Sequence, residues 1–341
     1  MPSNLPLAAR VISEGFLPAR SSLLQGPGDP VGGPVPPDRI RGMLLGLAIG
    51  DALGNTSEGM TPAHRASVHG EIGDYLPIRR ADACRVGLPS DDTQLAFWTL
   101  ESLLEFGDLD PEDVAKKFTG HQIFGIGSAV RQFLANRADG VTPWYRCGVE
   151  SAGNGALMRV APIVLLHPAG TSVALADLLA RLLRMPDPPA PDWIIATFLN
   201  TVRQVCTDQR YQPRRGRFAD WEGPFPDYLD HVLGEARQHG CSTRDACDAW
   251  CSGAYLLETV PSVLCILTKH AHDPEEAIIR AVNDTDDNDT VAAIVGAAVD
   301  ALHGDAALPT RWRSGLLGRT QATDNGQVFR LVEAAVRREW G

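Results

Sequence analysis

An acidic segment that runs directly into an apolar one constrains this chain more than any other feature. Residues 284–289 contain four aspartates, and the run 291–302 that follows has the composition of a buried helix. Carboxylates so close together repel one another unless positive charge lies among them. A bound metal ion is one interpretation, since Asp287, Asp289 and Thr290 supply the hard oxygen ligands that magnesium and manganese prefer. The other is a helix N-terminus at which an aspartate caps the first turn.

A second segment has the same character. Ser90, Asp91, Asp92 and Thr93 precede another apolar helical run at 95–104. Two helix starts of this kind can meet in space and hold two metal ions between them. We therefore expect a binuclear metal site for Mg²⁺ or Mn²⁺.

Glycines recur at every fourth position of the first long helical run, at Gly42, Gly46, Gly50 and Gly54. One face of a helix over 38–54 then lacks side chains, so another helix can approach its backbone closely. Glycine costs a helix about 0.5–1 kcal/mol per position relative to alanine, which close packing must offset. Charged residues flank this short apolar run, so we predict a buried helix of a soluble fold and not a membrane helix.

Apolar residues with a helical period cover most of the chain beyond residue 92, and strand signals are nearly absent. The predicted fold class is all-α, a compact orthogonal multi-helix bundle. The expected helical stretches are 95–106, 111–118, 129–134, 156–166, 173–183, 193–205, 225–240, 246–268, 274–282, 291–302 and 326–340.

The composition excludes some functions. The 341 residues include 42 Asp and Glu against 31 Lys and Arg, for a formal net charge of -11. No basic stripe offsets that charge, so we expect no nucleic-acid binding. No apolar run approaches ~18 residues and the N-terminus lacks a signal-peptide core, so we expect no membrane segment.

The seven cysteines lack paired spacing, which indicates reduced thiols and a cytoplasmic protein. A zinc site at Cys241, Cys247 and Cys251 with His239 is the alternative. Buried free thiols are favoured, because cysteine packs as a small hydrophobic residue.

Residues 1–38 differ in character from the rest. An amphipathic piece at 8–16 is followed by a linker rich in proline and glycine at 26–37. We expect an N-terminal extension over 1–38 and one domain over 39–341. The extension is either an arm that docks on a surface, which we favour, or a disordered tail.

Four motifs resemble those of the ADP-ribosylglycohydrolases, in the same order. They are Gly50-Asp51-Ala-Leu-Gly54 with Glu58, Ser90-Asp-Asp-Thr93, Gly153-Asn-Gly-Ala-Leu-Met-Arg159 and Asp287-x-Asp289-Thr290-Val-Ala-Ala-Ile. Each motif alone is a weak signal, but four in the right order make a specific match. The resemblance covers 39–341, and it implies an all-α hydrolase of the group that includes dinitrogenase reductase-activating glycohydrolase.

The resemblance also implies roles for residues at the matching positions. The implied ligands of two Mg²⁺ or Mn²⁺ ions are Ser90, Asp91, Asp92, Asp287, Asp289 and Thr290. The implied loops for ribose and phosphates contain Gly127, Ser128, Gly153, Asn154 and Gly155. Glu58 falls where relatives use a glutamate to activate water or to hold the ribose, and Glu58 and Asp287 are the expected catalytic residues. Met158 and Arg159 are expected to brace the loop before them.

These residue types fit one reaction. Cleavage of ADP-ribose from a side chain proceeds through an oxocarbenium-like state, which needs an activated water and fixed ribose hydroxyls. Two divalent cations can bind those hydroxyls and lower the pKa of a water. Glycine-rich loops offer backbone N–H groups to a diphosphate.

Some positions keep two interpretations. Asp51 belongs to the site directly, or it only caps a turn or hydrogen-bonds to a group behind the metal ligands. We favour the second interpretation, because the paired carboxylates already supply the metal ligands. Asp284 and Asp286 offer a second register for the last motif. Trp144 and Tyr145 stack on adenine or belong to ordinary packing, and the second is the more common case.

We therefore expect a dimetal hydrolase that removes ADP-ribose from modified protein side chains, with arginine favoured by analogy with bacterial relatives. An alternative of a different class is an immunity protein that binds and blocks an ADP-ribosyltransferase toxin through residues 1–38, with or without hydrolysis. A pseudoenzyme, or a hydrolase for a small ADP-ribosylated metabolite, is the third alternative.

Overall fold

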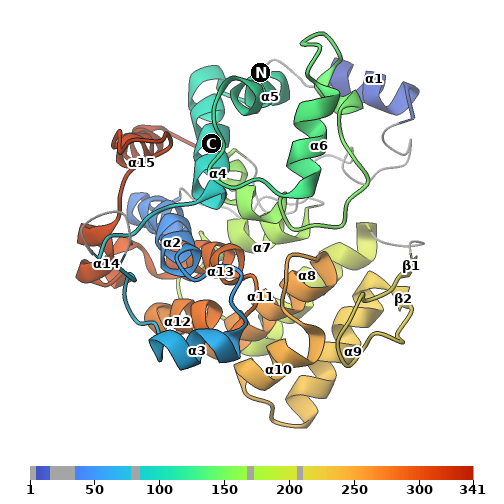
Figure 1. Cartoon of the computed structure of the whole chain (residues 1–341), viewed down its shortest axis with the longest axis vertical. Coiled ribbons are helices and arrows are strands. Elements are labelled where there is room, and N and C mark those ends of the chain that lie inside the picture. Colours follow the sequence, from blue (N-terminus) through green and yellow to red (C-terminus); the bar gives the residue numbers. More distant parts are fainter. Residues whose placement is uncertain (1–4, 16–34, 78–84, 167–172, 206–209, 341) are drawn as a thin grey trace.

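The structure is a computed structural model that describes residues 5–15, 35–77, 85–166, 173–205 and 210–340. Helices make up almost all of its regular structure (Figure 1), so the all-α prediction is confirmed. In the described residues, the paired strands are the short β1 (Arg210–Tyr211) and β2 (Gly223–Pro224), which run antiparallel.

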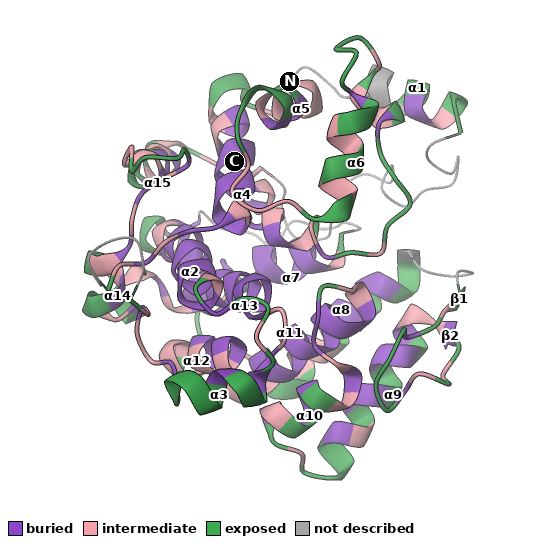
Figure 2. Ribbon diagram, viewed as in Figure 1, coloured by how far each residue is buried: buried purple, intermediate pink, exposed green. Residues whose placement is uncertain are grey.

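Helices α2 (Pro37–Asn55) and α13 (Asn288–His303) form the centre of the fold, and both are buried over most of their length (Figure 2). The four regularly spaced glycines of α2 face α13. A Cβ added at any of them would lie 2.1 to 2.4 Å from an atom of α13. The prediction of a close helix contact is therefore confirmed. Because Gly54 lies against Asp289, this contact also joins the C-terminal end of α2 to the N-terminal end of α13.

Other helices surround this pair. Those that contact α13 are α4 (Asp91–Phe106), α7 (Ala174–Leu182), α11 (Leu256–His270) and α12 (Pro274–Asp284), and α15 (Gln327–Arg337) contacts α2. The remaining α-helices are α1 (Leu5–Ser13), α3 (Pro62–His69), α5 (Pro111–Gly120), α6 (Ser128–Asn136), α8 (Pro191–Val205), α9 (Phe225–Gln238), α10 (Thr243–Trp250) and α14 (Thr310–Gly315). Short 3-10 helices are η2 (Trp144–Arg146), η3 (Leu157–Arg159), η4 (Ala161–Leu165) and η5 (Asp305–Ala307).

Two of the predicted helices are wrong in detail. The stretch 246–268 is not one helix, because α10 ends where Cys251 adopts a left-handed backbone conformation with φ 68°, and α11 begins only after a loop. The stretch 156–166 forms the 3-10 turns η3 and η4 instead of an α-helix. Pro162 lies inside it, and proline cannot donate the backbone hydrogen bond that a helix interior requires.

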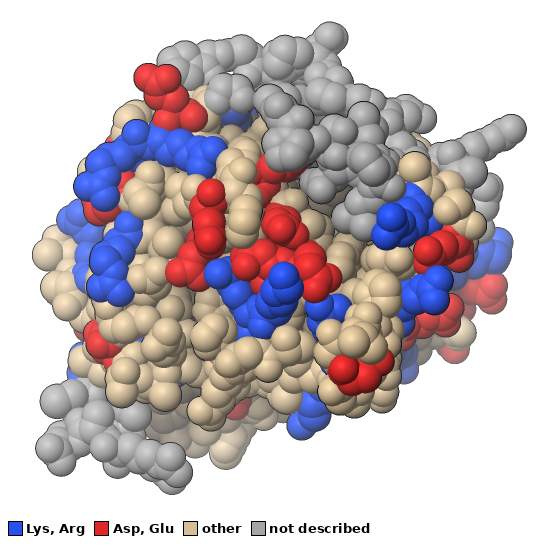
Figure 3. Space-filling model, turned by 90° about the horizontal axis from the view of Figure 1, so that it is seen from above, with Lys and Arg blue, Asp and Glu red and all other residues tan. Residues whose placement is uncertain are grey.

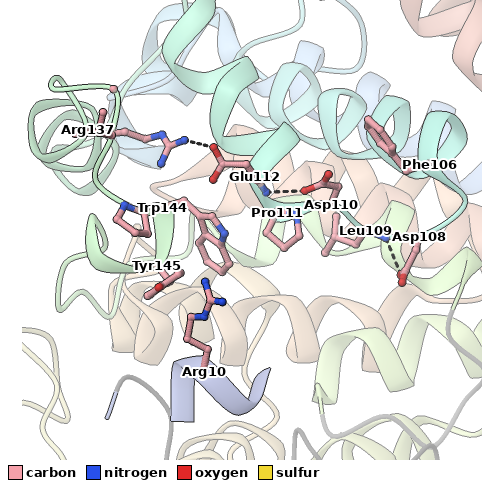
Figure 4. A pocket seen from close by; sticks show the side chains of 13 residues that line it. Arg10, Phe106, Asp108, Leu109, Asp110, Pro111, Glu112, Arg137, Trp144 and Tyr145 are labelled. Carbon is pink, nitrogen blue, oxygen red and sulfur yellow. Dashed lines mark hydrogen bonds and ion pairs between the residues drawn. The ribbon is translucent and has the colours of Figure 1, made fainter. Parts of the chain in front are cut away.

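The described part of the N-terminal extension docks on the body of the protein. The Glu14 carboxylate accepts hydrogen bonds from Arg146, at 2.8 and 3.0 Å, and from the Tyr145 hydroxyl at 3.4 Å. Val11 on α1 is buried. Trp144 and Tyr145 therefore lie beside α1, where Arg10 points toward them across a cavity of about 640 Å³ (Figure 4). Much of the extension, 1–4 and 16–34, lies outside the described residues.

In the part of the chain that the structure describes, no helix is both long and apolar enough to cross a membrane. Charged side chains of both signs share the surface. Figure 3 shows acidic side chains gathered near the middle of one face, with basic side chains beside them. Ion pairs join the two kinds in places, for example Arg41 with Glu333 and Arg280 with Glu276, both at 2.9 Å.

Candidate metal and substrate site

The two acidic helix starts, far apart in the sequence, meet at the end of α2. Oxygens of Asp51, Asp92 and Asp289 lie within 4.8 Å of one another, and all three side chains are buried. The close contact of Gly54 with Asp289 places α13 here. The structure thus brings together Asp92 and Asp289, as expected, and adds Asp51 to them.

Asp51 reaches from α2 to the first turn of α4. Its carboxylate accepts hydrogen bonds from the backbone N–H of Ser90 at 2.9 Å, the N–H of Thr93 at 3.0 Å and the Thr93 hydroxyl. Negative charge is favourable at a helix N-terminus, so Asp51 caps α4 from a different helix. The capping interpretation of Asp51 agrees with this geometry, and the same carboxylate also belongs to the acidic group.

The acidic group contains an oxygen that lacks a partner. Asp92 Oδ2 accepts a hydrogen bond from the Ser90 hydroxyl at 3.2 Å, but the buried Asp92 Oδ1 has no hydrogen-bond partner among the described residues. A buried carboxylate oxygen beside two other carboxylates is unfavourable unless a proton or a cation compensates it. The oxygen-only donor set fits Mg²⁺ or Mn²⁺. The residues present are therefore suited to a divalent cation.

Burial and mutual repulsion raise the pKa values of these carboxyl groups. Burial, with a further contribution from the Asp51 charge, raises the pKa of Asp91 to about 7. Burial raises the pKa of Asp287 to about 6. The pKa values of Asp92 and Asp289 are raised well above the ordinary range, first by burial and then by neighbouring aspartates. A bound cation would relieve the same repulsion that these protons relieve.

Asp287 is partly buried beside the group, immediately before α13. Its carboxylate accepts a hydrogen bond from the side-chain amide of Asn154, which also donates to the Thr259 hydroxyl at 3.0 Å. The Asp287 N–H donates to the Ser252 carbonyl at 3.1 Å. Asn154 is buried, and its amide contacts a predicted metal ligand. The family resemblance implied a different role for Asn154, in a loop that holds ribose and phosphates.

Ion pairs distinguish the aspartates of the last motif from one another. Asp284 lies 3.6 Å from Arg280, and Asp286 lies 3.7 Å from Arg215. Asp287 and Asp289 form no ion pair with any described residue. The two carboxylates without a basic partner, Asp287 and Asp289, are thus the ones predicted as metal ligands.

The other predicted ligands and Glu58 lie around this group. Ser90 is the N-cap of α4, where its hydroxyl accepts from the Asp92 N–H at 3.2 Å. Thr290 is buried in the first turn of α13, and its side chain hydrogen-bonds to Asp287. Glu58 is exposed on the turn after α2, close enough for its charge to raise the pKa values of Asp287 and Asp289.

The segment with Gly153 and Gly155 is tied to the beginning of α11. Gly153 pairs with Tyr255 in an isolated antiparallel bridge. Arg159 donates from Nε to the Gly155 carbonyl at 2.8 Å, as expected of a residue that braces this loop. Buried Met158 packs in the small apolar cluster beside α4.

Gly127 and Ser128 form the exposed start of α6, which no side chain caps. The contact between this loop and the acidic group is made by Gly125, where an added Cβ would lie 2.6 Å from Asp91 Oδ1. The loop is therefore adjacent to Asp91, with Gly127 and Ser128 two and three residues further along it.

Gln94 is a residue of the site that the sequence analysis missed. Its buried amide donates to the carbonyls of Gln122 and Thr320, both at 3.0 Å, and accepts from the Phe124 N–H at 3.0 Å. It therefore holds the segment that leads into Gly125 against the start of α4. The available signal was its place directly after Asp91, Asp92 and Thr93.

The cavity of Figure 4 is a separate feature. It is lined by Phe106, at the C-terminal end of α4, whereas the acidic group lies at the N-terminal end. The 16 residues of α4 span roughly 24 Å at a helical rise. Among the described residues, the acidic group consists of carboxylates and contains no thiol. Cys241, Cys247 and Cys251 are free.

The chain is similar to a set of known proteins. A sequence model of the ADP-ribosylglycohydrolase family matches residues 34–340. An uncharacterized protein of Archaeoglobus fulgidus is 31% identical over 83% of this chain and 92% of its own length. ADP-ribosylarginine hydrolase Tri1 of Serratia proteamaculans is 28% identical over 81% of this chain and 74% of its own.

Two further similarities extend over nearly the whole length of the relative. ADP-ribosyl-dinitrogen reductase glycohydrolase of Rhodospirillum rubrum is 26% identical over 89% of this chain and 98% of its own length. A solved structure described as an ADP-ribosylglycohydrolase-related protein complex matches with a TM-score of 0.61 at 27% identity. That match covers 88% of this chain and 98% of the solved chain.

Proposed function

The chain belongs to the ADP-ribosylglycohydrolase family, a family of hydrolases, and on that premise we propose that it removes ADP-ribose from arginine side chains of proteins in a dimetal-dependent reaction. The observation that carries the proposal is the meeting of two distant helix starts in one buried group of carboxylates at Asp51, Asp92 and Asp289. The arginine linkage is supported by the names of relatives, two of which are ADP-ribosylarginine hydrolases.

The proposed metal ligands are Ser90, Asp91, Asp92, Asp287, Asp289 and Thr290. Two divalent cations bound there would lower the pKa of a water molecule and would bind the ribose hydroxyls. Asp51 fixes the first turn of α4 by capping it, and Asn154 fixes Asp287 through its amide. Groups that orient ligands in this way matter nearly as much as the ligands.

Glu58 is the proposed general base. It lies on an exposed turn beside the group, where substrate and water have access. The bond that breaks joins the anomeric carbon to the side-chain nitrogen of the modified arginine. The water oxygen bonds to that carbon, and its proton passes to the Glu58 carboxylate. The electrons of the broken bond leave with the arginine nitrogen, and the proton on Glu58 returns to the released guanidine, which restores both the guanidinium and the carboxylate.

The diphosphate of ADP-ribose would bind at the start of α6. Backbone N–H groups at an uncapped helix N-terminus are suited to anions, and Gly127 leaves them accessible. Gly125 joins this position to Asp91. The exposed Gly153 lies next to Asn154, on the Asp287 side of the group. We propose that these two loops hold the phosphates and ribose.

An assay of released ADP-ribose tests the proposal. Three substrates, with ADP-ribose linked to a protein arginine, to a protein serine and to a nucleobase, are compared in Mg²⁺, in Mn²⁺ and in EDTA. Release from arginine, lost in EDTA and restored by Mg²⁺ or Mn²⁺, is the expected result. Release from the serine substrate alone would refute the arginine assignment, and full activity in EDTA would refute the dimetal reaction.

The second proposed role is binding of an ADP-ribosyltransferase toxin through residues 1–38. The position of α1 favours it: the helix lies on the surface of the protein and precedes residues 34–340, which the family model matches. Its described contacts with the body include those of Glu14 with Arg146 and Tyr145 and the burial of Val11. Exposed ion pairs such as that of Glu14 with Arg146 add little stability.

A further inference from the structure

Arg65 on α3 is a fully buried guanidinium with an exposed fraction of 0%. It donates from Nη1 to the Thr285 carbonyl and from Nη2 to the Met60 carbonyl, both at 2.9 Å. It also donates from Nε to the Ser57 hydroxyl at 3.1 Å. Each of its three nitrogens therefore has an acceptor.

These acceptors belong to the two loops of the proposed site. Ser57 and Met60 are on either side of Glu58, and Thr285 begins the loop that leads to Asp287 and Asp289. The five N–H groups of arginine lie in one plane, so acceptors on both loops are held in a fixed relative position. The guanidinium thus connects the turn of the proposed base with the loop of the proposed ligands.

A second side chain strengthens this connection. The Asn288 amide, between Asp287 and Asp289, donates to the Ser57 hydroxyl and to the Gly54 carbonyl, both at 3.0 Å. The Ser57 hydroxyl therefore accepts hydrogen bonds from Arg65 and from Asn288, and it donates one to the Gly54 carbonyl at 3.2 Å. All of these groups are buried, so the network works in a low dielectric, where its hydrogen bonds are strong.

Arg65 is charged although it is buried. Burial lowers the pKa of Arg65 to about 10, while Asp286 and Asp289 favour the charged form, so the guanidinium is charged at neutral pH. No carboxylate forms an ion pair with it in the described parts of the chain. A buried cation without a paired carboxylate is costly, and an apolar residue would pack at this position without that cost.

Glu58 has no side-chain anchor of its own. Its carboxylate forms no hydrogen bond or ion pair with any residue that the structure describes. The position of that carboxylate is consequently set by the backbone of its turn. Ser57 and Met60, which are two of the three acceptors of Arg65, are part of that turn.

From this geometry we propose that Arg65 is a positioning residue for hydrolysis: it sets the placement of Glu58 relative to Asp287 and Asp289. The inference rests on the proposed function, in which Glu58 is the base. Lysine keeps the charge but cannot reach three acceptors in one plane. A shift of the base by about 1 Å is enough to lower a rate by roughly 100-fold.

A purely structural role of Arg65 must be distinguished from this one. Arg65 and Pro62 are the buried residues of α3, so loss of Arg65 also loosens the helix. The matched control is Pro62→Ala, which weakens the packing of α3 and leaves the hydrogen bonds of Arg65 in place. Ser57→Ala is a second variant that removes one acceptor without removing the charge.

The first measurement is hydrogen exchange of the metal-free protein. In Arg65→Lys we expect faster exchange in both 57–60 and 285–288, by about tenfold or more, with exchange within the rest of α13 unchanged. Pro62→Ala should not produce this joint change. Unchanged exchange in either loop of Arg65→Lys would overturn the inference, whatever the activity of the enzyme.

The second measurement is a double-mutant cycle on kcat with an ADP-ribosyl-arginine protein. Arg65→Lys should lower kcat by roughly 10- to 100-fold with KM within about threefold. In a Glu58→Gln background the same change should lower kcat by less than about threefold, because its effect acts through the base. An equal loss of kcat in both backgrounds would overturn the inference about Arg65 without contradicting the proposed hydrolysis. Wild-type protein that releases no ADP-ribose would refute the proposed function, and hydrogen exchange would still decide the role of Arg65.

Discussion

One oxygen of the Asp51 carboxylate accepts two hydrogen bonds from Thr93, one from the backbone N–H at 3.0 Å and one from the hydroxyl. The carboxylate belongs to the central glycine-rich helix, and Thr93 belongs to the first turn of α4. The pair therefore holds the acidic start of α4 against α2. The contact of Gly54 with Asp289 holds the acidic start of α13 against the same helix. Removal of either partner should loosen the acidic group from one side.

Thr93→Val should lower the free energy of unfolding by about 1–2 kcal/mol, because a buried carboxylate loses a donor. The matched control is Thr99→Val in the same helix. The Thr99 hydroxyl donates to the Leu95 carbonyl at 2.9 Å, which is a local bond that adds little stability. Urea unfolding in EDTA measures both variants, and equal values would contradict the proposed importance of the contact.

The stability of the metal-free protein should fall as pH rises from about 5 to 8. The pKa values of Asp91 and Asp287 in the folded protein are raised to about 7 and about 6, above the unfolded value of about 4. Their contribution is complete below the unfolded pKa and is lost as pH rises through the folded pKa values. Added Mn²⁺ should restore the melting temperature at pH 8. A melting temperature in EDTA that rises over this range would contradict the prediction.

Asp289→Asn should reduce kcat/KM on an ADP-ribosyl-arginine protein by about 100-fold or more in saturating Mg²⁺, because the site loses a carboxylate ligand. Asp286→Asn is the control from the same loop. Its carboxylate pairs with the exposed Arg215 at 3.7 Å, and such pairs are weak, so the loss should stay within about fivefold. A larger loss of kcat/KM in Asp286→Asn than in Asp289→Asn would show that the metal ligands are Asp284 and Asp286.

Asn154→Ala should weaken Mn²⁺ binding by roughly 10- to 100-fold, since Asp287 loses the amide that orients it. Titration calorimetry with the metal alone measures the affinity. Asn154 is buried and its amide also donates to Thr259, so circular dichroism first checks that the variant is folded. Unchanged affinity together with a raised KM would instead favour the loop role that the sequence assigned to Asn154.

Deletion of residues 1–36 should abolish stoichiometric binding of an ADP-ribosyltransferase toxin and leave hydrolysis unchanged. The deletion removes α1 and ends just before α2 begins at Pro37. Analytical gel filtration with a toxin measures binding, and released ADP-ribose measures activity. Binding that persists without the segment would end the second proposed role.

Some of this architecture was accessible from local pattern alone. A glycine at every fourth position predicts a close helix contact wherever the partner lies, because only a bare face admits another backbone. An acidic run before an apolar run predicts a helix start with the chemistry of a metal site. Helical periodicity predicts the fold class, although the break at Cys251 escaped it, since one left-handed residue leaves no periodic signal.

The sequence by itself therefore determined most of the helices, the acidic helix starts and the family resemblance, because each of these depends on residues that are neighbours along the chain. Only the tertiary structure decided that Asp51 joins Asp92 and Asp289, that the Asn154 amide contacts Asp287, and that Gln94 and Arg65 hold the surrounding loops. Those relationships depend on how helices pack across long separations in sequence. A hydrogen bond between distant residues exists only once the packing has fixed both partners.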